Sequence, residues 1–271
     1  MGVTGGSVLI VLPTLGDRLD TLELTLRSID VQRDDVALRL VVVTPDSAVE
    51  ARTLAERHGA TVVGDPRTGI SAAINAGVEA ADAESYYAWM GDDDLFRPGA
   101  LRKLVDLMES RPDVVVAYGG CDYIDPDGRR IGTSRAGRAA RWLLPWGPDL
   151  IPHPGSMIRL DVMRQVGLFD PSLKYAMDLD MFLKLRSTGR FRSTRESVSA
   201  FRWHPDSLTV SNRQASSAES EAVKRRHLPT ALRPVAPLWE FPVRWAAARA
   251  ALAVSSRARR LAADREVSHA G

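Results

Sequence analysis

The feature that most constrains the fold is an alternation, from residue 8 to residue 108, between short apolar runs and segments of helical period. The apolar runs cover residues 8–12, 38–43, 61–63 and 86–90. Runs of this length and character are typical of strands that are covered on both faces. Because each run is followed by a helical pattern, the order predicts right-handed crossovers and a parallel, doubly wound sheet.

The segments between the runs carry helix signals of their own. Apolar residues recur at helical spacing over residues 19–29, 70–78 and 101–108. Ser47 with Glu50 three residues later matches a capping box, and Gly59 is a plausible helix stop. Pro98 is expected at the start of the helix after the fourth run.

Polar residues follow three of the predicted strands. Pro13-Thr14, residues 44–47 and residues 92–94 all come directly after an apolar run. Ligands of doubly wound sheets bind at the carboxyl ends of the strands, so these segments are predicted to meet at one edge of the sheet.

The third of these segments contains three consecutive carboxylates, Asp92, Asp93 and Asp94. Adjacent carboxylates at the end of a buried strand repel one another and lose hydration. A hard divalent cation would offset this cost, because Mg²⁺ or Mn²⁺ takes carboxylate, water and phosphate oxygens. The alternative is a solvated turn in which one aspartate caps the next helix.

The second half of the chain is less regular. We expect a strand over 114–118, a turn or hairpin at 125–128 and a long loop over 132–150. A short helix over 161–166 and a helix that begins near Asp178 follow. A strand or its exit is expected at 201–204, and a basic helical segment beyond about residue 215.

Composition excludes several classes of protein. The 271 residues have a formal net charge of +2, which argues against a nucleic-acid binder. The single cysteine, Cys121, excludes an internal disulfide and a four-cysteine zinc site. After the run at 114–118 it is expected to be a buried small residue, with a nucleophile as the alternative. No signal peptide or apolar stretch of transmembrane length is evident, and a reducing, cytoplasmic setting is expected.

Four blocks, in this order, resemble a known family. They are Val8–Thr14 with Arg18, Gly69–Gly77, Gly91–Pro98 with Leu101, and Gly167–Leu173 followed by Asp178-Leu179-Asp180 and Arg202–Ser207. With these blocks the chain resembles the inverting family 2 glycosyltransferases of bacterial type. The resemblance implies the GT-A fold, a Rossmann-like, mostly parallel sheet with helices on both faces. It would occupy residues 1–215, with a nucleotide-binding half to about residue 120, an acceptor half over 121–215, and a basic helical extension over 216–271.

The resemblance also implies an activity. Such enzymes transfer a hexosyl-type sugar from a UDP, dTDP or GDP donor, with inversion and assistance from Mg²⁺ or Mn²⁺. The acceptor would be a hydroxyl of a glycan, a polysaccharide or a lipid-linked molecule. A catalytically silent sugar-nucleotide-binding or scaffold protein of the same fold is the alternative.

By resemblance, the donor contacts are Pro13, Thr14, Leu15, Arg18, Asp46, Arg67, Asn75, Asp92 and Asp93. The family's third block begins with an aspartate where this chain has Gly91. Asp93 then becomes the metal ligand through the diphosphate, with Asp94 beside it, and Asp92 faces the ribose. In the alternative alignment with the family's third block, Asp92 and Asp94 are the two outer aspartates of the motif.

Two further departures concern the base and the phosphates. The family often has an aspartate directly after the second strand, where this chain reads Val43-Thr44-Pro45-Asp46, so Asp46 would serve from a displaced position. The arginine that often precedes the asparagine of the second block is Ile74 here. Arg67 would replace it as a phosphate contact, or is a solvated loop residue.

The resemblance assigns the general base to Asp178, which matches the second residue of the family's acidic pair. A helix N-cap is the structural alternative for this residue. Asp180 is expected to point elsewhere and to be structural. His204 would complete the metal shell or lie on the surface. His153 lies in a segment that borders the acceptor site in the family.

Aromatic residues suggest two further contacts. Trp142 and Trp146 would stack on an acceptor or pack internally. From residue 222 onward ten Lys or Arg face three Asp or Glu, so the tail has a net charge of +7. This tail contains Leu238, Trp239, Phe241, Val243 and Trp245, near Arg244, Arg249, Arg257, Arg259 and Arg260. It would lie on the anionic inner face of the plasma membrane, or form a solvated helix.

Two other enzyme classes fit poorly. A phosphotransfer enzyme typically needs a P-loop or an aspartate nucleophile after the first strand, and Pro13-Thr14 stands there. A dinucleotide oxidoreductase is excluded because no G-x-G-x-x-G follows the first strand.

Overall fold

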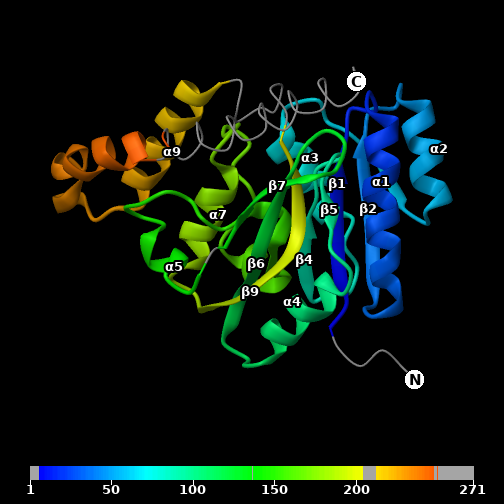
Figure 1. The fold of residues 1–271 in the computed structure, drawn as a ribbon, viewed down its shortest axis with the longest axis horizontal. Helices are drawn as coiled ribbons and strands as arrows, with labels where there is room; N and C mark the ends of the chain where they lie inside the picture. The colour runs from blue at the N-terminus through cyan, green and yellow to red at the C-terminus, as the bar shows by residue number, and fades with distance from the viewer. Residues whose placement is uncertain (1–5, 136, 204–211, 247–248, 250–271) are drawn as a thin grey trace, which may run out of the picture.

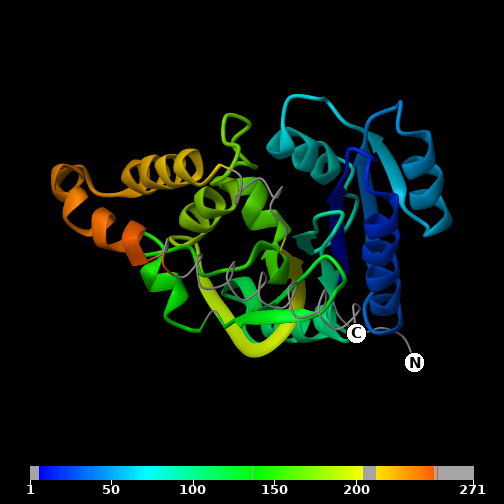
Figure 2. The ribbon, with the colours of Figure 1, turned by 45° about the horizontal axis from the view of Figure 1, so that its top comes forward.

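The computed structural model describes residues 6–135, 137–203, 212–246 and 249 (Figure 1). Its centre is one nine-stranded sheet in the order β3-β2-β1-β4-β8-β6-β9-β5, with β7 paired to β6. Figures 1 and 2 show helices α1 and α2 at one end of this sheet and the C-terminal helices at the other.

The first half is parallel, as the alternation predicts. Strands β1 (Val8–Pro13), β2 (Leu38–Thr44), β3 (Thr61–Gly64) and β4 (Tyr86–Trp89) pair with parallel register. They are connected by α1 (Leu19–Asp30) with the 3₁₀ turn η1 (Val31–Asp34), by α2 (Val49–Arg57) and by α3 (Ile70–Glu79). Thr14, Asp65 and the acidic loop therefore lie at one edge of the sheet.

The second half mixes strand directions. Strand β8 (Ser156–Arg159) lies antiparallel between β4 and β6 (Val114–Ile124), whereas β9 (Arg190–Arg202) is parallel to β6. Strand β7 (Arg130–Ser134) forms the predicted hairpin with β6, and β5 (Leu95–Phe96) pairs with β9. Residue 120 falls inside β6, so both halves share one sheet.

Two apolar layers sandwich the sheet. Val8, Ile10 and Leu12 of β1 pack with residues of α1, α2 and α4 (Ala100–Glu109). Leu9 and Val11 face the other side, with residues of α3, α6 (Leu160–Gln165) and α7 (Met177–Leu185). This alternation along one strand is the period of two expected when both faces are covered.

The C-terminal part packs on the second half of the sheet. Helix α9 (Arg213–His227) lies against α7, and it is followed by η3 (Thr230–Val235) and a helical segment over 237–246. The short elements α5 (Ala140–Leu143) and η2 (His153–Gly155) lie in the segment before β8. Within the described ranges no helix is both long and apolar enough to cross a membrane.

Several local predictions were wrong. The capping box at Ser47 and Glu50 does not form, because a turn closed by the Ala48 N–H and the Pro45 carbonyl moves the start of α2 to Val49. Helix α4 begins two residues after Pro98, since Gly99 with φ of 67° reverses the chain first.

Several elements of the second half were also missed, among them β8. Residues 132–150, predicted to be a loop, include part of β7 and the short helix α5. Strand β5 directly after the acidic loop has only two residues, too few for periodicity to reveal.

Helix α3 approaches β1 closely at Gly77. A Cβ atom added there would lie 2.4 Å from Cγ1 of Val11. We expect Gly77→Ala to lower the free energy of unfolding by about 1–3 kcal/mol, because overpacking outweighs the gain in helix propensity. Urea denaturation measures this change. Gly137→Ala is the control, since no described atom lies within 4 Å of its added Cβ; an equal effect of both substitutions would contradict the close packing.

Candidate active site

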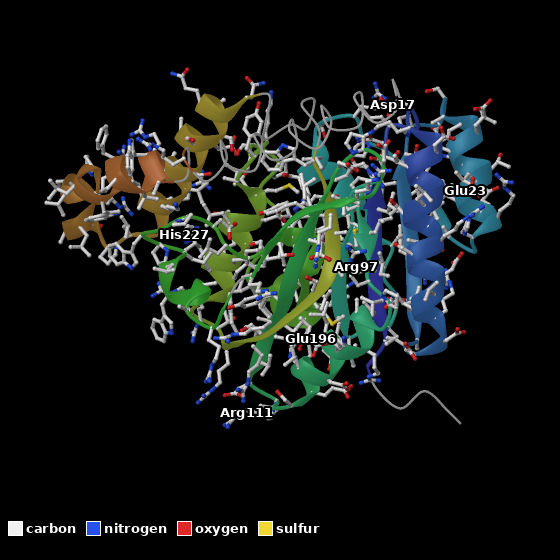
Figure 3. The ribbon with its side chains drawn as sticks, in the orientation of Figure 1. Asp17, Glu23, Arg97, Arg111, Glu196 and His227 are labelled. Carbon is white, nitrogen blue, oxygen red and sulfur yellow. The ribbon has the colours of Figure 1, made fainter. Side chains whose placement is uncertain are left out.

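A cavity of about 930 Å³ opens at the carboxyl ends of β1 and β4. Its walls come from the loops after β1, β3 and β4, from the start of α7 and from the end of β9. Asp17, on its rim, is labelled at the top of Figure 3. The predicted convergence of loops on one edge is therefore present, and the second half of the chain closes the site.

Asp92 is buried and held by the first strand. Its Oδ2 accepts a hydrogen bond of 2.6 Å from the Thr14 hydroxyl, and its Oδ1 accepts one of 2.6 Å from Arg18. Burial raises the pKa of Asp92 to about 6, although Thr14 and Arg18 both favour the charged form. The other arm of the Arg18 guanidinium lies 2.7 Å from Asp93 Oδ2, so one arginine bridges two adjacent carboxylates.

Asp94 and the backbone of the acidic loop are held from the opposite side. The Arg202 N–H donates to Asp94 Oδ1 at 3.1 Å, and its guanidinium donates to the Asp93 carbonyl at 3.1 Å. The Thr25 hydroxyl donates to the Asp94 carbonyl at 2.8 Å. Arg202 is only 5% exposed, so this anchor at the end of β9 is largely removed from water.

Gly91 leaves space between two of the carboxylates. A Cβ at this residue would lie 3.1 Å from Asp94 Oδ2 and 3.3 Å from Asp93 Oδ1. Two carboxylate oxygens therefore face one small volume beside the cavity. Two carboxylates, with water and phosphate oxygens, suit Mg²⁺ or Mn²⁺. Among the described residues no group of three or more His, Cys, Asp or Glu side chains is arranged to hold a metal ion, and His204 lies outside these residues.

Asp178 lines the cavity from the first turn of α7, where Ala176 is the N-cap. Its Oδ1 accepts a hydrogen bond of 2.9 Å from the Trp89 indole N–H, at the end of β4. Partial burial raises the pKa of Asp178, against the influence of His153 and of this hydrogen bond. The last residue of the strand that leads to the acidic loop thus orients the carboxylate on the other wall.

His153 stands between the two walls. Its ring stacks on Trp89 with centroids 4.1 Å apart, and Nε2 lies 3.5 Å from Asp94 Oδ2. This Nε2 makes no hydrogen bond to any residue that the structure describes. Burial opposes protonation of His153, but Asp94 and Asp178 outweigh it and raise the pKa of the ring.

Asp180 points away from the cavity, as predicted. Its carboxylate lies 2.8 Å from His227 Nε2 on α9 and 2.9 Å from Lys184 Nζ. Cys121 is buried, and burial raises the pKa of its thiol to about 12, which fits the small buried residue rather than the nucleophile.

The structure separates the predicted donor contacts into two groups. Lining the cavity are Pro13, Thr14, Leu15, Arg18, Arg67, Asp92 and Asp93, and the predicted metal ligand Asp94 lines it too. Asp46 does not line it; its side chain is 89% exposed and pairs with Arg52 at 3.1 Å. Asn75 does not line it either, because its amide bonds the carbonyl and the N–H of Phe169.

Some cavity residues escaped the sequence reasoning. Asp65 follows β3 and lines the cavity, where its Oδ1 accepts the Arg67 N–H at 2.7 Å. Its place after the third predicted strand was a usable signal, by the same rule that pointed to Thr14. Lys174, Tyr175 and Phe201 also line the cavity, but no motif marked them.

The comparison with protein families agrees with this geometry. The profile described as "Glycosyl transferase family 2" matches residues 9–166, more than half of the chain. The chain belongs to glycosyltransferase family 2. The match contains the first three blocks except Val8, and the mostly parallel α/β sheet with helices on both faces is the GT-A architecture.

Curated relatives of this family 2 glycosyltransferase are themselves described as glycosyltransferases. An uncharacterized glycosyltransferase of Mycobacterium tuberculosis is 34% identical over 184 residues, which cover 65% of this chain and 78% of the relative. One of Rickettsia prowazekii is 25% identical over 157 residues, which cover 54% of this chain and 49% of the relative. The chain thus spans about half the length of the Rickettsia protein.

Solved structures share the fold of this glycosyltransferase. Staphylococcus aureus TarS, in complex with UDP-GlcNAc, has a TM-score of 0.62 at 14% identity over 82% of this chain and 65% of that chain. The mannosyltransferase PcManGT from Pyrobaculum calidifontis, with GDP-Man and Mn²⁺, has a TM-score of 0.59 at 19% identity over 96% of this chain and 79% of that chain. At such identities the likeness concerns the fold alone.

The contact between Trp89 and Asp178 can be tested without an assay of transfer. In a double-mutant cycle, Trp89→Phe removes the donor and Asp178→Ala the acceptor. Because the bond involves a charged group, we expect a coupling free energy of about 1.5–3 kcal/mol at neutral pH. Urea unfolding of the four proteins gives this value. Additive effects of the two substitutions would show that the hydrogen bond does not form.

Proposed function

We propose that this chain transfers a hexosyl-type sugar from a nucleotide-diphosphate donor to an acceptor hydroxyl, with inversion at the anomeric carbon. One observation carries the proposal: the carboxylates after β4 and the carboxylate of Asp178, which come from different elements, line one cavity. The departing diphosphate needs stabilisation of its negative charge on one side of the sugar, and the attacking hydroxyl needs a general base on the other side.

The donor side is the wall formed by the loops after β1, β3 and β4. Thr14, Leu15, Arg18 and Arg67 would hold the nucleotide, and Asp65 would lie near its base. TarS with UDP-GlcNAc and PcManGT with GDP-Man support a donor of the UDP or GDP type, and a dTDP sugar is the third donor in this proposal. In this proposal Asp46 and Asn75 do not contact the donor, because neither lines the cavity.

Asp93 and Asp94 fit a divalent cation, since Asp93 Oδ1 and Asp94 Oδ2 face the volume beside Gly91. When bound, Mg²⁺ or Mn²⁺ supplies positive charge that stabilises the departing diphosphate. Mn²⁺ is present in the complexes of PcManGT and of the Mycobacterium tuberculosis glucosyl-3-phosphoglycerate synthase. Arg18 and Arg202 keep the carboxylates in place, and Arg18 limits their mutual repulsion.

Asp178 would accept the proton of the attacking hydroxyl. Its raised pKa strengthens it as a base, and the Trp89 N–H fixes one oxygen. Among the described residues that line the cavity, Asp178 is the carboxylate assigned to the acceptor side, and direct displacement assisted by one base inverts the anomeric centre. We propose a glycan, polysaccharide or lipid-linked acceptor, which would enter beside Lys174 and Tyr175.

Substitution of Asp178 tests the proposal. Asp178→Asn should lower kcat by about 10²–10⁴-fold, because the amide cannot accept the proton, while the affinity for nucleotide diphosphate stays unchanged. Donor turnover with a panel of glycan and lipid-linked acceptors measures the first effect, and calorimetry measures the second.

The control is Asp180→Asn, which makes the same change two residues further along α7. Its partners are Lys184 and His227, so it should lower thermal stability but retain kcat while folded. If Asp178→Asn kept full activity, its assigned role would be wrong. If the parent chain bound nucleotide sugars but transferred none, the silent binding protein would replace the enzyme.

A further inference from the structure

The helical segment over 237–246 presents an apolar face to solvent. Leu238, Phe241 and Trp245 are 77%, 70% and 57% exposed. They are spaced by three and four residues, so they form one stripe along the helix. An exposed stripe of large apolar side chains marks an interaction site more often than single exposed residues do.

The opposite face fixes the orientation of this helix. Glu240 is buried and pairs with Arg225 of α9, while Arg244 lies 3.1 Å from Glu221 of the same helix. Trp239 turns inward, where its ring meets that of Trp146 with centroids 5.1 Å apart. The stripe of Leu238, Phe241 and Trp245 therefore points outward, because the opposite face of the helix packs against α9 and Trp146.

The same end of the molecule carries a second apolar element. Trp142 on α5 is 63% exposed, and Leu143 beside it is also exposed. The contact of Trp146 with Trp239 and the hydrogen bond from Lys224 to the Gly147 carbonyl join this segment to the C-terminal helices. Figures 1 and 2 both place α5 beside these helices, at the end of the molecule remote from α1 and α2.

Arginines accompany these tryptophans. The Arg249 guanidinium lies 4.5 Å from the Trp245 ring centroid, and that of Arg141 lies 5.3 Å from the Trp142 ring centroid. The sequence from residue 222 onward has ten basic against three acidic side chains. Tryptophan and arginine, with apolar bodies and polar or charged ends, are suited to the headgroup region of a bilayer.

We propose that Leu238, Phe241 and Trp245, with Trp142 and Leu143 of α5, form a surface that docks this protein on an anionic lipid bilayer. The apolar stripe would enter the interface, and Arg249 beside Trp245 would meet lipid phosphates. Arg141 is held by the carbonyls of Arg186 and Gly189 and would support Trp142 from behind.

Helix α9 connects this surface to the cavity. Its Arg225 pairs with Glu240 of the segment over 237–246, and its His227 binds Asp180, two residues from Asp178. The proposal does not depend on the transfer reaction.

Vesicle co-sedimentation of the full chain tests this surface. The probes are vesicles of phosphatidylcholine and of phosphatidylcholine mixed with phosphatidylglycerol. We expect binding to the mixed vesicles, weakened by salt. Phe241→Ser with Trp245→Ser should reduce the partition coefficient by about tenfold or more, because two aromatic side chains no longer enter the interface. Trp142→Ser alone should cause a smaller loss.

The control is Leu24→Ser with Val49→Ser, two exposed apolar residues of α1 and α2 outside the proposed surface. It should bind vesicles as the parent chain does. Absence of binding to the mixed vesicles, or equal loss in both double variants, would overturn the proposal. A dimer in light scattering that Phe241→Ser with Trp245→Ser dissociates would identify the surface as a contact between two copies, and would also overturn it.

Discussion

The candidate site depends on how the chain holds adjacent carboxylates at the end of a buried strand. Desolvation and mutual repulsion would push such a loop outward or keep it protonated. Thr14 and Arg18 hold it from the first strand and its loop, and Arg202 holds it from the last strand of the sheet. The ends of the sheet-forming sequence, far apart along the chain, are therefore both needed to position the acidic loop.

A single indole connects this loop to the other wall of the cavity. Trp89 ends β4, donates to Asp178 and stacks on His153. Trp89, a buried residue of β4, thus orients Asp178 and His153, which come from the second half of the chain. This arrangement follows from inserting the antiparallel strand β8 next to β4, which brings the second half of the chain against the first.

The sequence predicted the parallel half of the fold well, because its signals are local. Apolar runs and helical spacing depend on neighbours within a few residues. The second half was predicted less completely, since β5 has two residues and β6 and β9 pair with irregular register. Pairing between residues that far apart leaves little trace in local periodicity.

The same division applies to the site. The acidic loop, Thr14 and Arg18 were predictable from strand ends and resemblance, and the structure brings them together. Asp46 and Asp65 both follow strands, and only the geometry shows that Asp65 lines the cavity. In the tail, Trp239 and Phe241 look alike in sequence, but packing against Trp146 and α9 turns one inward and leaves the other exposed.

The central claim is that the acidic loop holds a divalent cation opposite Asp178. Anomalous diffraction from crystals grown with Mn²⁺ and a nucleotide diphosphate measures this directly. The account predicts a manganese peak beside Gly91, within coordination distance of Asp93 and Asp94 and on the cavity side of the loop. A bound nucleotide with no manganese there, or with the metal held at another carboxylate cluster, would contradict it.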